Sequence, residues 1–241
     1  MTQIQSQVLG YTCDGLAFES RLVFDAGDTA SRPGLLMAPN WFGVSDGAVD
    51  LAGQVASRGY RVLLVDLYGA AVRPGSPAEA GAAMLPLKQD RVLMRRRLVA
   101  ALDALRGQQA VLMDGKRLAA FGFCFGGTCA LELARAGAPL KAAVSFHGAL
   151  DTPDPSDARN IQGAVLVLDG ALDPLVPREQ LPAFAREMGE AGVDWQLLSY
   201  GGAVHSFTDP AANHPGTAQY NATVSRRAFT AMYALLDEVF A

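Results

Sequence analysis

The chain has 241 residues, half of them hydrophobic, which is enough to bury a sizeable core in one α/β domain or in two small ones. The formal net charge of -4, from 20 basic and 24 acidic residues, argues against a large basic surface for binding nucleic acid. The sequence also lacks a basic amphipathic segment of the kind that binds membrane surfaces. We therefore expect a single domain over residues 1–241 that binds a small molecule without a cofactor or metal. Three cysteines and a polar N-terminal stretch favour a reducing cytoplasm.

The first 66 residues predict a strand pair followed by a βαβ unit. Residues 7–25 alternate in polarity around Cys13-Asp14-Gly15, a hairpin turn signal. The continuous apolar run Gly34–Ala38 is typical of a strand buried on both faces. A helix is expected over Asp46–Arg58, and a second buried strand over Arg61–Asp66.

The next segment reads as a loop and then a helix. Tyr68–Pro86 is rich in Gly, Ala and Pro with little periodicity, which predicts an irregular excursion that could form a pocket wall. Apolar residues at helical spacing predict a helix over Lys88–Arg106. The three adjacent residues Arg95–Arg97 fan around such a helix, so we expect a solvated face there and no anion site.

The second half of the chain alternates strands with helices. Apolar runs predict strands at three places, and helical spacing predicts two helices between and after them; the runs are Ala142–Phe146, Ala164–Leu168 and Trp195–Leu198, and the helices Arg178–Ala191 and Thr217–Phe240. This alternation indicates an α/β fold with a mostly parallel sheet covered on both faces.

The most informative stretch is Lys116–Ala134, where an apolar strand turns directly into a helix at Cys124. Gly122 and Gly126 flank the cysteine two residues away on each side, as a nucleophile elbow with positive φ requires. The helix N-terminus also directs free amides at the sulfur. We interpret Cys124 as a nucleophile, against the alternative of a buried structural thiol, and Cys129 as a core residue.

Two later loops supply partners for this thiol. Asp173 follows the strand that ends at Leu168, and His205 follows the strand that ends near Tyr200. Strand ends of a parallel sheet meet at one edge, and the chain order nucleophile, acid, histidine is that of a hydrolase sheet. We therefore predict a triad in which His205 takes the thiol proton and Asp173 orients the imidazole.

Some residues compete for these roles. His147 follows a buried strand and either lines the pocket or is a hydrogen-bonded structural histidine. Asp169 is less suited than Asp173 as the acid, because it precedes the turn glycine. Ser45 also lies in a Gly-x-Ser-x-Gly pattern, but its strand stops at Ala38, so we interpret Ser45 as a helix N-cap.

These residues closely resemble those of the dienelactone hydrolase family of α/β-hydrolases. The matching segments, in family order over nearly the whole chain, are Asn40–Val44, Asp66–Tyr68, Gly122–Gly127, Ser145–Gly148, Gly170–Pro177 and Gly202–Phe207. The resemblance implies the α/β-hydrolase fold and a triad of Cys124, His205 and Asp173. It also implies an oxyanion hole formed by the backbone amides of Phe125 and Trp41.

The chain departs from the founding type of the family at two places. That type has a glutamate at the position of Asn40, which helps to activate the thiol; here activation falls to His205, and Asn40 becomes a candidate hydrogen-bond donor to substrate or oxyanion. It also has a substrate-binding arginine four residues beyond the catalytic histidine, where this chain has Asp209. Asn40, His147 and Asp209 are thus the candidate substrate-binding residues.

From these features we expect hydrolysis of small esters or lactones through a thioester acyl-enzyme. Thioester hydrolysis by the same triad is an alternative. A non-catalytic ligand-binding or redox-sensing homologue, with Cys124 as an oxidisable thiol, is another. The sequence alone gives no oligomeric state.

Overall fold

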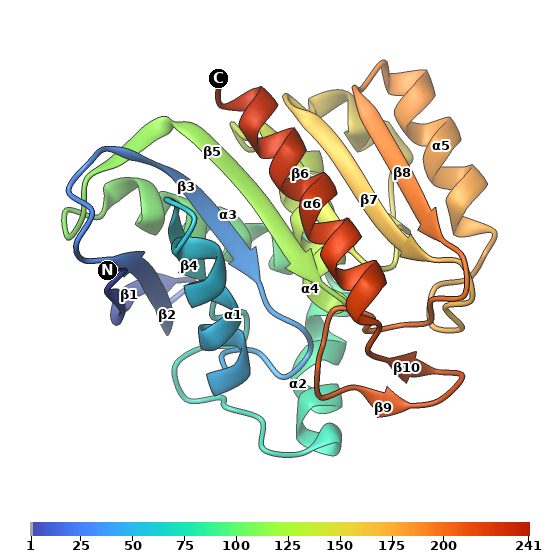
Figure 1. Ribbon diagram of the computed structural model, residues 1–241, viewed down its shortest axis with the longest axis horizontal. Coiled ribbons are helices and arrows are strands. Elements are labelled where there is room, and N and C mark those ends of the chain that lie inside the picture. The colour runs from blue at the N-terminus through green and yellow to red at the C-terminus, as the bar shows by residue number, and fades with distance from the viewer. Residues whose placement is uncertain (1) are drawn as a thin grey trace. The chain divides into compact units, whose positions relative to one another are not determined.

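The computed structural model describes residues 2–241, which form an eight-stranded, mostly parallel sheet in the order β1-β2-β4-β3-β5-β6-β7-β8, with helices, and a small two-stranded sheet (Figure 1). The strands are β1 (Ile4–Cys13), β2 (Leu16–Asp25), β3 (Arg32–Ala38), β4 (Arg61–Leu64), β5 (Met113–Phe123), β6 (Ala142–Phe146), β7 (Ala164–Gly170), β8 (Trp195–Tyr200), β9 (Asn213–His214) and β10 (Ala218–Gln219). The helices are α1 (Asp46–Ala56), α2 (Pro77–Gln89), α3 (Arg91–Gly107), α4 (Phe125–Arg135), α5 (Gln180–Ala191) and α6 (Ala222–Val239), with a 3₁₀ turn η1 (Pro155–Asn160). The predicted fold class is confirmed.

The chain divides into two compact units, one reaching to Ala120 and the other running from Phe121 to Ala241. Strand β5 passes from the first unit into the second.

The first unit contains the predicted hairpin and βαβ motif. β1 pairs with β2 in antiparallel register, and β3 pairs with β4 in parallel register through the crossover helix α1. The hairpin turn comprises Asp14 and Gly15 alone, with φ of 50° and 76°. Cys13 is therefore the last residue of β1, opposite Leu16. The prediction that Cys13 belongs to the turn is wrong.

The irregular excursion predicted for Tyr68–Pro86 is wrong in its second half, which is helix α2. Ser76 accepts a hydrogen bond from the amide of Glu79, whose carboxylate accepts in return from the amide of Gly75. Pro77 occupies the first turn, where its missing N–H is not needed. The sequence does contain a helix start signal, Ser-Pro-x-Glu at residues 76–79. The prediction missed this signal because the high content of Gly, Ala and Pro favours a loop.

The arginines at the middle of α3 point in different directions, as expected for adjacent helical residues. Arg96 is exposed and lies 3.3 Å from Asp14. Arg97 donates to the carbonyl of Leu67 and lies over the ring of Phe18, 5.3 Å from its centroid. Arg95 and Arg97 are half-buried, so the expected solvated face is limited to Arg96.

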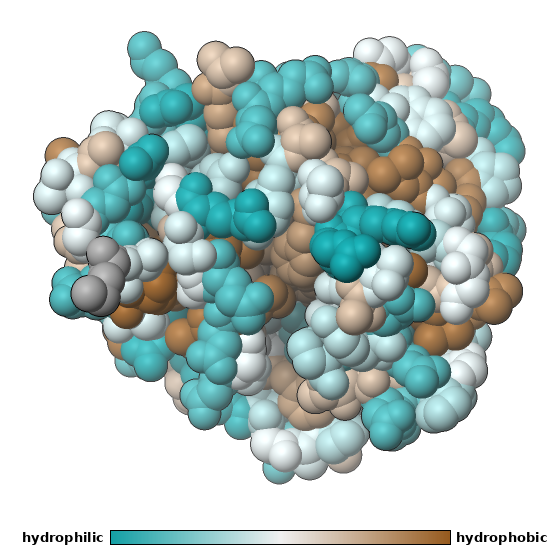
Figure 2. Space-filling model, in the orientation of Figure 1, coloured by the Kyte–Doolittle hydropathy of each residue, from teal (hydrophilic) through white to brown (hydrophobic). Residues whose placement is uncertain are grey.

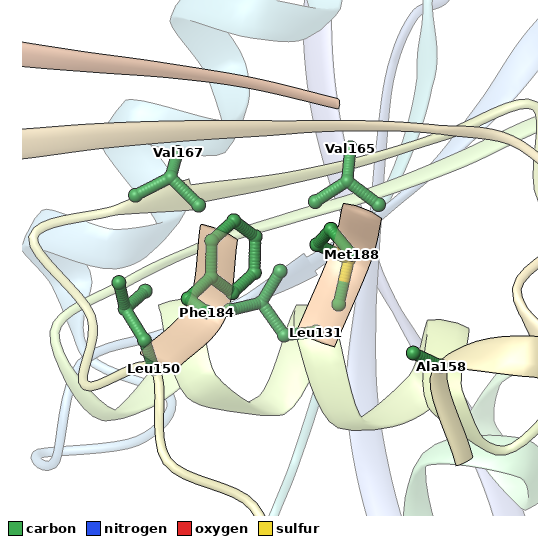
Figure 3. Packing of buried hydrophobic residues seen from close by; sticks show 7 residues of the cluster. All are labelled: Leu131, Leu150, Ala158, Val165, Val167, Phe184 and Met188. Atoms are coloured by element: carbon green, nitrogen blue, oxygen red, sulfur yellow. The ribbon is translucent and has the colours of Figure 1, made fainter. Parts of the chain in front are cut away.

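In the second unit, helices cover both faces of the parallel strands β6, β7 and β8. On one face, Phe229 of α6 packs on Phe123 and Phe146, with ring centroids 6.0 and 5.0 Å away. On the other, a cluster of buried residues joins β7 to α4 and α5 (Figure 3): Leu131, Leu150, Ala158, Val165, Val167, Phe184 and Met188. Figure 2 shows some apolar surface in the region of β7 and β8, where Leu198 is 37% exposed.

Helix α6 begins later than predicted. Residues 217–221 were expected to be helical, but Ala218–Gln219 form β10, which pairs with β9. The helix starts at Ala222 because Asn221 caps it by accepting a hydrogen bond from the amide of Val224. Across residues 2–241, none of the helices has the length and apolar character needed to cross a membrane.

A buried ion cluster joins α4 to α5. The guanidinium of fully buried Arg135 contacts both carboxylate oxygens of Glu187 at 2.8 Å and Oε1 of Glu132 at 3.0 Å. It also donates to the carbonyl of Leu150. Buried charges persist only when they are paired, so α4, which directly follows Cys124, is fixed to its surroundings by this cluster.

Replacing Arg135 therefore has a large effect on stability. Arg135→Ala leaves two buried carboxylates without their cation, and we expect a loss of about 3–5 kcal/mol in the free energy of unfolding, measured by urea denaturation. The matched control Arg96→Ala removes an exposed ion pair and is expected to change stability by about 1 kcal/mol or less. Equal losses in the two variants would contradict the assignment.

Candidate active site

Cys124 lies at a sharp turn between β5, which ends at Phe123, and α4, which begins at Phe125. Its backbone has φ of 54° and ψ of -119°, a region that L-residues rarely adopt. The side chain is half-buried. The predicted abrupt passage from strand to helix is thus present, and Cys124 is the N-cap residue directly before the first N–H groups of α4.

Glycines let this turn pack tightly on the end of β6. A Cβ atom on Gly127 would lie 2.5 Å from Oγ of Ser145 and 3.0 Å from the Cα of Gly148. A Cβ atom on Gly148 would lie 2.8 Å from the amide nitrogen of Thr128. The distances of 2.5 and 2.8 Å are shorter than real Cβ contacts, so glycine fits on both sides of this contact where a larger residue would force a shift.

His205 and Asp173 lie together in the interior. Nδ1 of His205 is 2.7 Å from Oδ2 of Asp173, and the two residues are 5% and 2% exposed. The other oxygen of Asp173 accepts from the amide of Leu175. This arrangement fixes the imidazole with Nε2 directed away from the carboxylate.

The proton affinity of His205 is strongly perturbed. Burial alone lowers its pKa, but hydrogen bonding to Asp173 and Cys124 and the charges of both groups together raise that pKa to about 10. Within the described residues, the buried Nε2 of His205 has no hydrogen-bond partner at a well-formed distance and angle. Cys124 therefore raises the pKa of His205 by its proximity to the ring, without a well-formed hydrogen bond. The arrangement favours a histidine that holds a proton beside the sulfur.

Asp169, the competing acid, has a different task. Its two carboxylate oxygens accept from Arg178 at 2.9 and 3.0 Å, and Oγ of Ser199 donates to it at 2.7 Å. Arg178 also donates to the carbonyls of Gly170 and Val176, which bracket the loop carrying Asp173. Asp169 and Arg178 therefore fix the conformation of the loop that carries Asp173. Asp173 itself contacts His205.

His147 is buried, 3% exposed, and both of its ring nitrogens are within hydrogen-bond distance of protein atoms. Nδ1 is 3.1 Å from the backbone nitrogen of Cys124, and Nε2 is 2.8 Å from Oγ1 of Thr208. The ring meets that of His205 edge to face at 4.9 Å. Burial, and then the charge of His205, lower the pKa of His147 well below 6.5. This geometry favours the structural alternative over pocket lining.

The remaining serine candidate is engaged as an N-cap. Ser45 has extended φ and ψ of -124° and 163°, and its Oγ accepts from the amide of Ala48 at the start of α1. Its backbone has none of the strain seen at Cys124.

The loop with Asn40 and Trp41 is ordered by local bonds of the first unit. Oδ1 of Asn40 accepts from the amide of Phe42 at 3.0 Å, and the hydroxyl of Tyr68 donates to the carbonyl of Trp41 at 2.7 Å. Gly43 closes the turn with φ of 71°. The Asn40 amide group therefore has its nitrogen side left as a donor.

Two charged side chains, the candidate Asp209 and Arg73 of the first unit, are held by bonds to their own surroundings. Asp209 is half-buried, and its Oδ1 accepts from the amide of Ala211, so its carboxylate stabilises its own turn. Arg73 is engaged within the first unit, where it contacts Asp66 at 3.2 Å and Glu19 at 3.9 Å.

Sequence reasoning missed Thr208 and Arg178 as members of the site. Thr208 lies three residues after His205, but nothing in its spacing shows that its hydroxyl meets His147. Arg178 was placed only at the start of a predicted helix. The Thr208 contact joins residues 61 positions apart, and the Arg178 contact with Asp169 spans a nine-residue loop whose course the sequence does not give.

Comparison with known proteins gives consistent matches. A family model described as the dienelactone hydrolase family matches residues 21–240. A Bradyrhizobium protein named probable 2-oxo-3-(5-oxofuran-2-ylidene)propanoate lactonase is 29% identical over 201 residues, 78% of this chain and 79% of that protein. A putative carboxymethylenebutenolidase of Escherichia coli O157:H7 is 27% identical over 190 residues, 73% of this chain and 67% of that one. A solved structure described as a dienelactone hydrolase-like promiscuous phosphotriesterase from metagenomic libraries is 41% identical, with a TM-score of 0.91, and the match covers 98% of this chain and 99% of that one.

The raised pKa of His205 can be tested by NMR titration of histidine-labelled protein. We expect His205 to titrate near 10 in the unmodified protein, and at lower pH in Asp173→Asn, because burial then acts without the opposing carboxylate.

The same shift predicts how stability depends on pH. Because the pKa in the folded state lies above the ordinary 6.5, the stabilising contribution is complete below pH 6.5 and is lost as pH rises through about 10. Asp173→Asn is therefore expected to destabilise the protein more at neutral pH than above pH 10. An unmodified His205 that titrates near 6.5 would contradict this account.

Proposed function

Because the chain belongs to the dienelactone hydrolase family and is a hydrolase of carboxylic ester or lactone bonds, we propose that it cleaves small esters or lactones with a triad of Cys124, His205 and Asp173. The observation that carries the proposal is the buried bond between His205 and Asp173, 2.7 Å long, with the other imidazole nitrogen under the influence of Cys124. The family match over residues 21–240 supports one hydrolase domain over residues 1–241.

In the proposed mechanism, the sulfur of Cys124 attacks the substrate carbonyl carbon while His205 holds the thiol proton. The tetrahedral intermediate collapses, the C–O bond breaks, and His205 gives its proton to the leaving oxygen. A thioester acyl-enzyme remains. Water then attacks the thioester with His205 as base, and the acid product and free thiol are released.

The developing oxyanion needs donors. The backbone amide of Phe125 is proposed as the first donor to the oxyanion, because it is at the N-terminus of α4, where the first N–H groups have no partners within the helix. The amide of Trp41 is proposed as the second donor from the family resemblance. Asn40 is proposed to supply a further hydrogen bond through its amide nitrogen, since its Oδ1 already accepts from Phe42. With no carboxylate at Asn40, activation of the thiol rests on His205.

Hydrolysis of phosphotriesters is a second candidate activity. The structure described as a promiscuous phosphotriesterase is 41% identical over almost the whole chain. The same thiol can attack phosphorus, expel an alkoxide or aryloxide that takes the proton from His205, and leave a phosphorylated sulfur for water to hydrolyse.

A thiol nucleophile must stay reduced to work. None of the three cysteines, Cys13, Cys124 and Cys129, is part of a disulfide. We therefore propose a cytoplasmic setting and a small neutral ester, lactone or related molecule as the partner.

The nucleophile is tested by comparing Cys124→Ala with Ser45→Ala. We expect Cys124→Ala to lower kcat on chromogenic esters and lactones by roughly 10⁴-fold or more with the fold intact, and Ser45→Ala to keep its activity. After incubation of the protein with a slowly hydrolysed ester, we expect mass spectrometry to detect an acyl group on Cys124. We also expect iodoacetamide to label Cys124 before Cys13 or Cys129.

The substrates for this test are the chromogenic esters and lactones together with a thioester and a phosphotriester. Activity kept in Cys124→Ala and lost in Ser45→Ala would move the nucleophile to Ser45. No turnover of any of these substrates by the unmodified protein would favour the non-catalytic alternative.

Substrate charge is tested at Asp209. A substrate carboxylate close to Asp209 meets a like charge, at about 1 kcal/mol for 4 Å in bulk water and more in a drier pocket. We expect neutral esters or lactones to be hydrolysed with a higher kcat/KM than a carboxylate-bearing dienelactone, and Asp209→Arg to shift the ratio toward the acidic substrate. The control Asp209→Asn is expected to give a smaller shift in the same direction. Efficient dienelactone hydrolysis that neither change affects would show that Asp209 has no role in selection.

A further inference from the structure

A single buried imidazole connects the turn at Cys124 with the segment that carries His205. His147 follows β6, and its two ring nitrogens meet the backbone nitrogen of Cys124 at 3.1 Å and Oγ1 of Thr208 at 2.8 Å. Thr208 lies three residues beyond His205. We propose that His147 is a positioning residue: as a neutral imidazole with its proton on Nε2, it holds the Cys124 amide and links it through Thr208 to the catalytic histidine. The inference rests on the proposed roles of Cys124 and His205.

The two contacts determine which nitrogen carries the proton. A backbone N–H can only donate, so Nδ1 of His147 must accept and must be unprotonated. A neutral ring then has its hydrogen on Nε2, which donates to Oγ1 of Thr208. The opposite tautomer, or the cation, would direct an N–H of the ring against the N–H of Cys124. Thr208 therefore selects the form of His147 that fits the turn.

The Cys124 amide needs such support because its backbone is strained. A positive φ at a non-glycine residue costs on the order of 1–3 kcal/mol and persists only where surroundings enforce it. The carbonyl of Phe146, at 3.0 Å, and Nδ1 of His147 are the two acceptors that share this N–H. Both lie at the end of β6, where Gly127 and Gly148 allow close approach. His147 itself has φ of 41°.

The surroundings of His147 keep it neutral. The ring is buried against Phe207 and His205, with centroids 5.0 and 4.9 Å away. Burial first, and the charge of His205 second, lower the pKa of His147. Asp173 contacts His205 and leaves His147 without a carboxylate among these partners. His147 therefore stays neutral with its single proton on Nε2, while the additional proton that makes an imidazole cationic is held by His205, beside Asp173.

The first test reads the tautomer directly and does not depend on activity. In unmodified protein with ¹⁵N-labelled histidine, we expect two-bond ¹H–¹⁵N correlations to show His147 neutral with its proton on Nε2. In Thr208→Val, which keeps the shape but removes the acceptor, we expect the Nδ1–H form to appear and hydrogen exchange of the Cys124 amide to become faster. A charged His147 at neutral pH, or an Nδ1–H form in the unmodified protein, would overturn the proposal.

The second test is a double-mutant cycle in kinetics. Thr208→Val is expected to lower kcat by about 10- to 100-fold with little change in KM, since a small displacement of the reacting groups has effects of this size. Thr208→Ser keeps the hydroxyl and is expected to restore most of the rate. His147→Asn keeps an acceptor in the place of Nδ1 and tolerates positive φ, so it should retain far more activity than His147→Ala.

In the His147→Asn background, Thr208→Val should have almost no further effect, because the link between the two residues is already absent. Equal effects of Thr208→Val in both backgrounds would overturn the proposal. A rise in KM with unchanged kcat in His147→Ala would do the same and assign His147 to substrate binding. The tautomer and amide-exchange results stand even if Cys124 proves not to be the nucleophile, so failure of this inference is distinguishable from failure of the triad.

Discussion

The left-handed backbone of Cys124 is the constraint on which the rest of the site depends. It places the thiol at the junction of β5 and α4, and it is costly for a residue with a side chain. The surrounding structure meets this cost with close glycine contacts at Gly127 and Gly148 and with two acceptors for one amide. α4 in turn is fixed by the buried charges around Arg135.

The second organising feature is that two acidic residues, one at the end of β7 and one just after it, have different partners. Asp169 and Asp173 are four residues apart, and both are almost fully buried. Arg178 and Ser199 satisfy the carboxylate of Asp169, which leaves only Asp173 to contact His205. A buried carboxylate requires such partners, so the partners decide which of the two can serve the histidine.

The two buried histidines also differ because of their partners. His205 has a carboxylate on one side and a thiol on the other, and its pKa is raised; His147 has an amide donor and a hydroxyl, and its pKa is lowered. Their rings are in edge-to-face contact. Opposite perturbation of neighbouring groups is the usual means by which a site keeps one residue as proton carrier and another neutral.

The α/β class, most of the alternation of strands and helices, and the strand-to-helix turn at Cys124 could be predicted from the sequence, because they follow from local periodicity and from glycines at fixed offsets. The family could be predicted from motifs that occur in its order along the chain. The sequence also identified Asp173 and His205 as candidates because strand ends in a parallel sheet meet at one edge. It did not show α2, since an Ala- and Gly-rich amphipathic pattern is weak there, or the hairpin of β9 and β10. The pairing of Arg178 with Asp169 and the contacts of His147 with Cys124 and Thr208 became visible only in the folded chain. These contacts connect residues 9 to 61 positions apart, and local spacing carries no information about which polar groups meet at such separations.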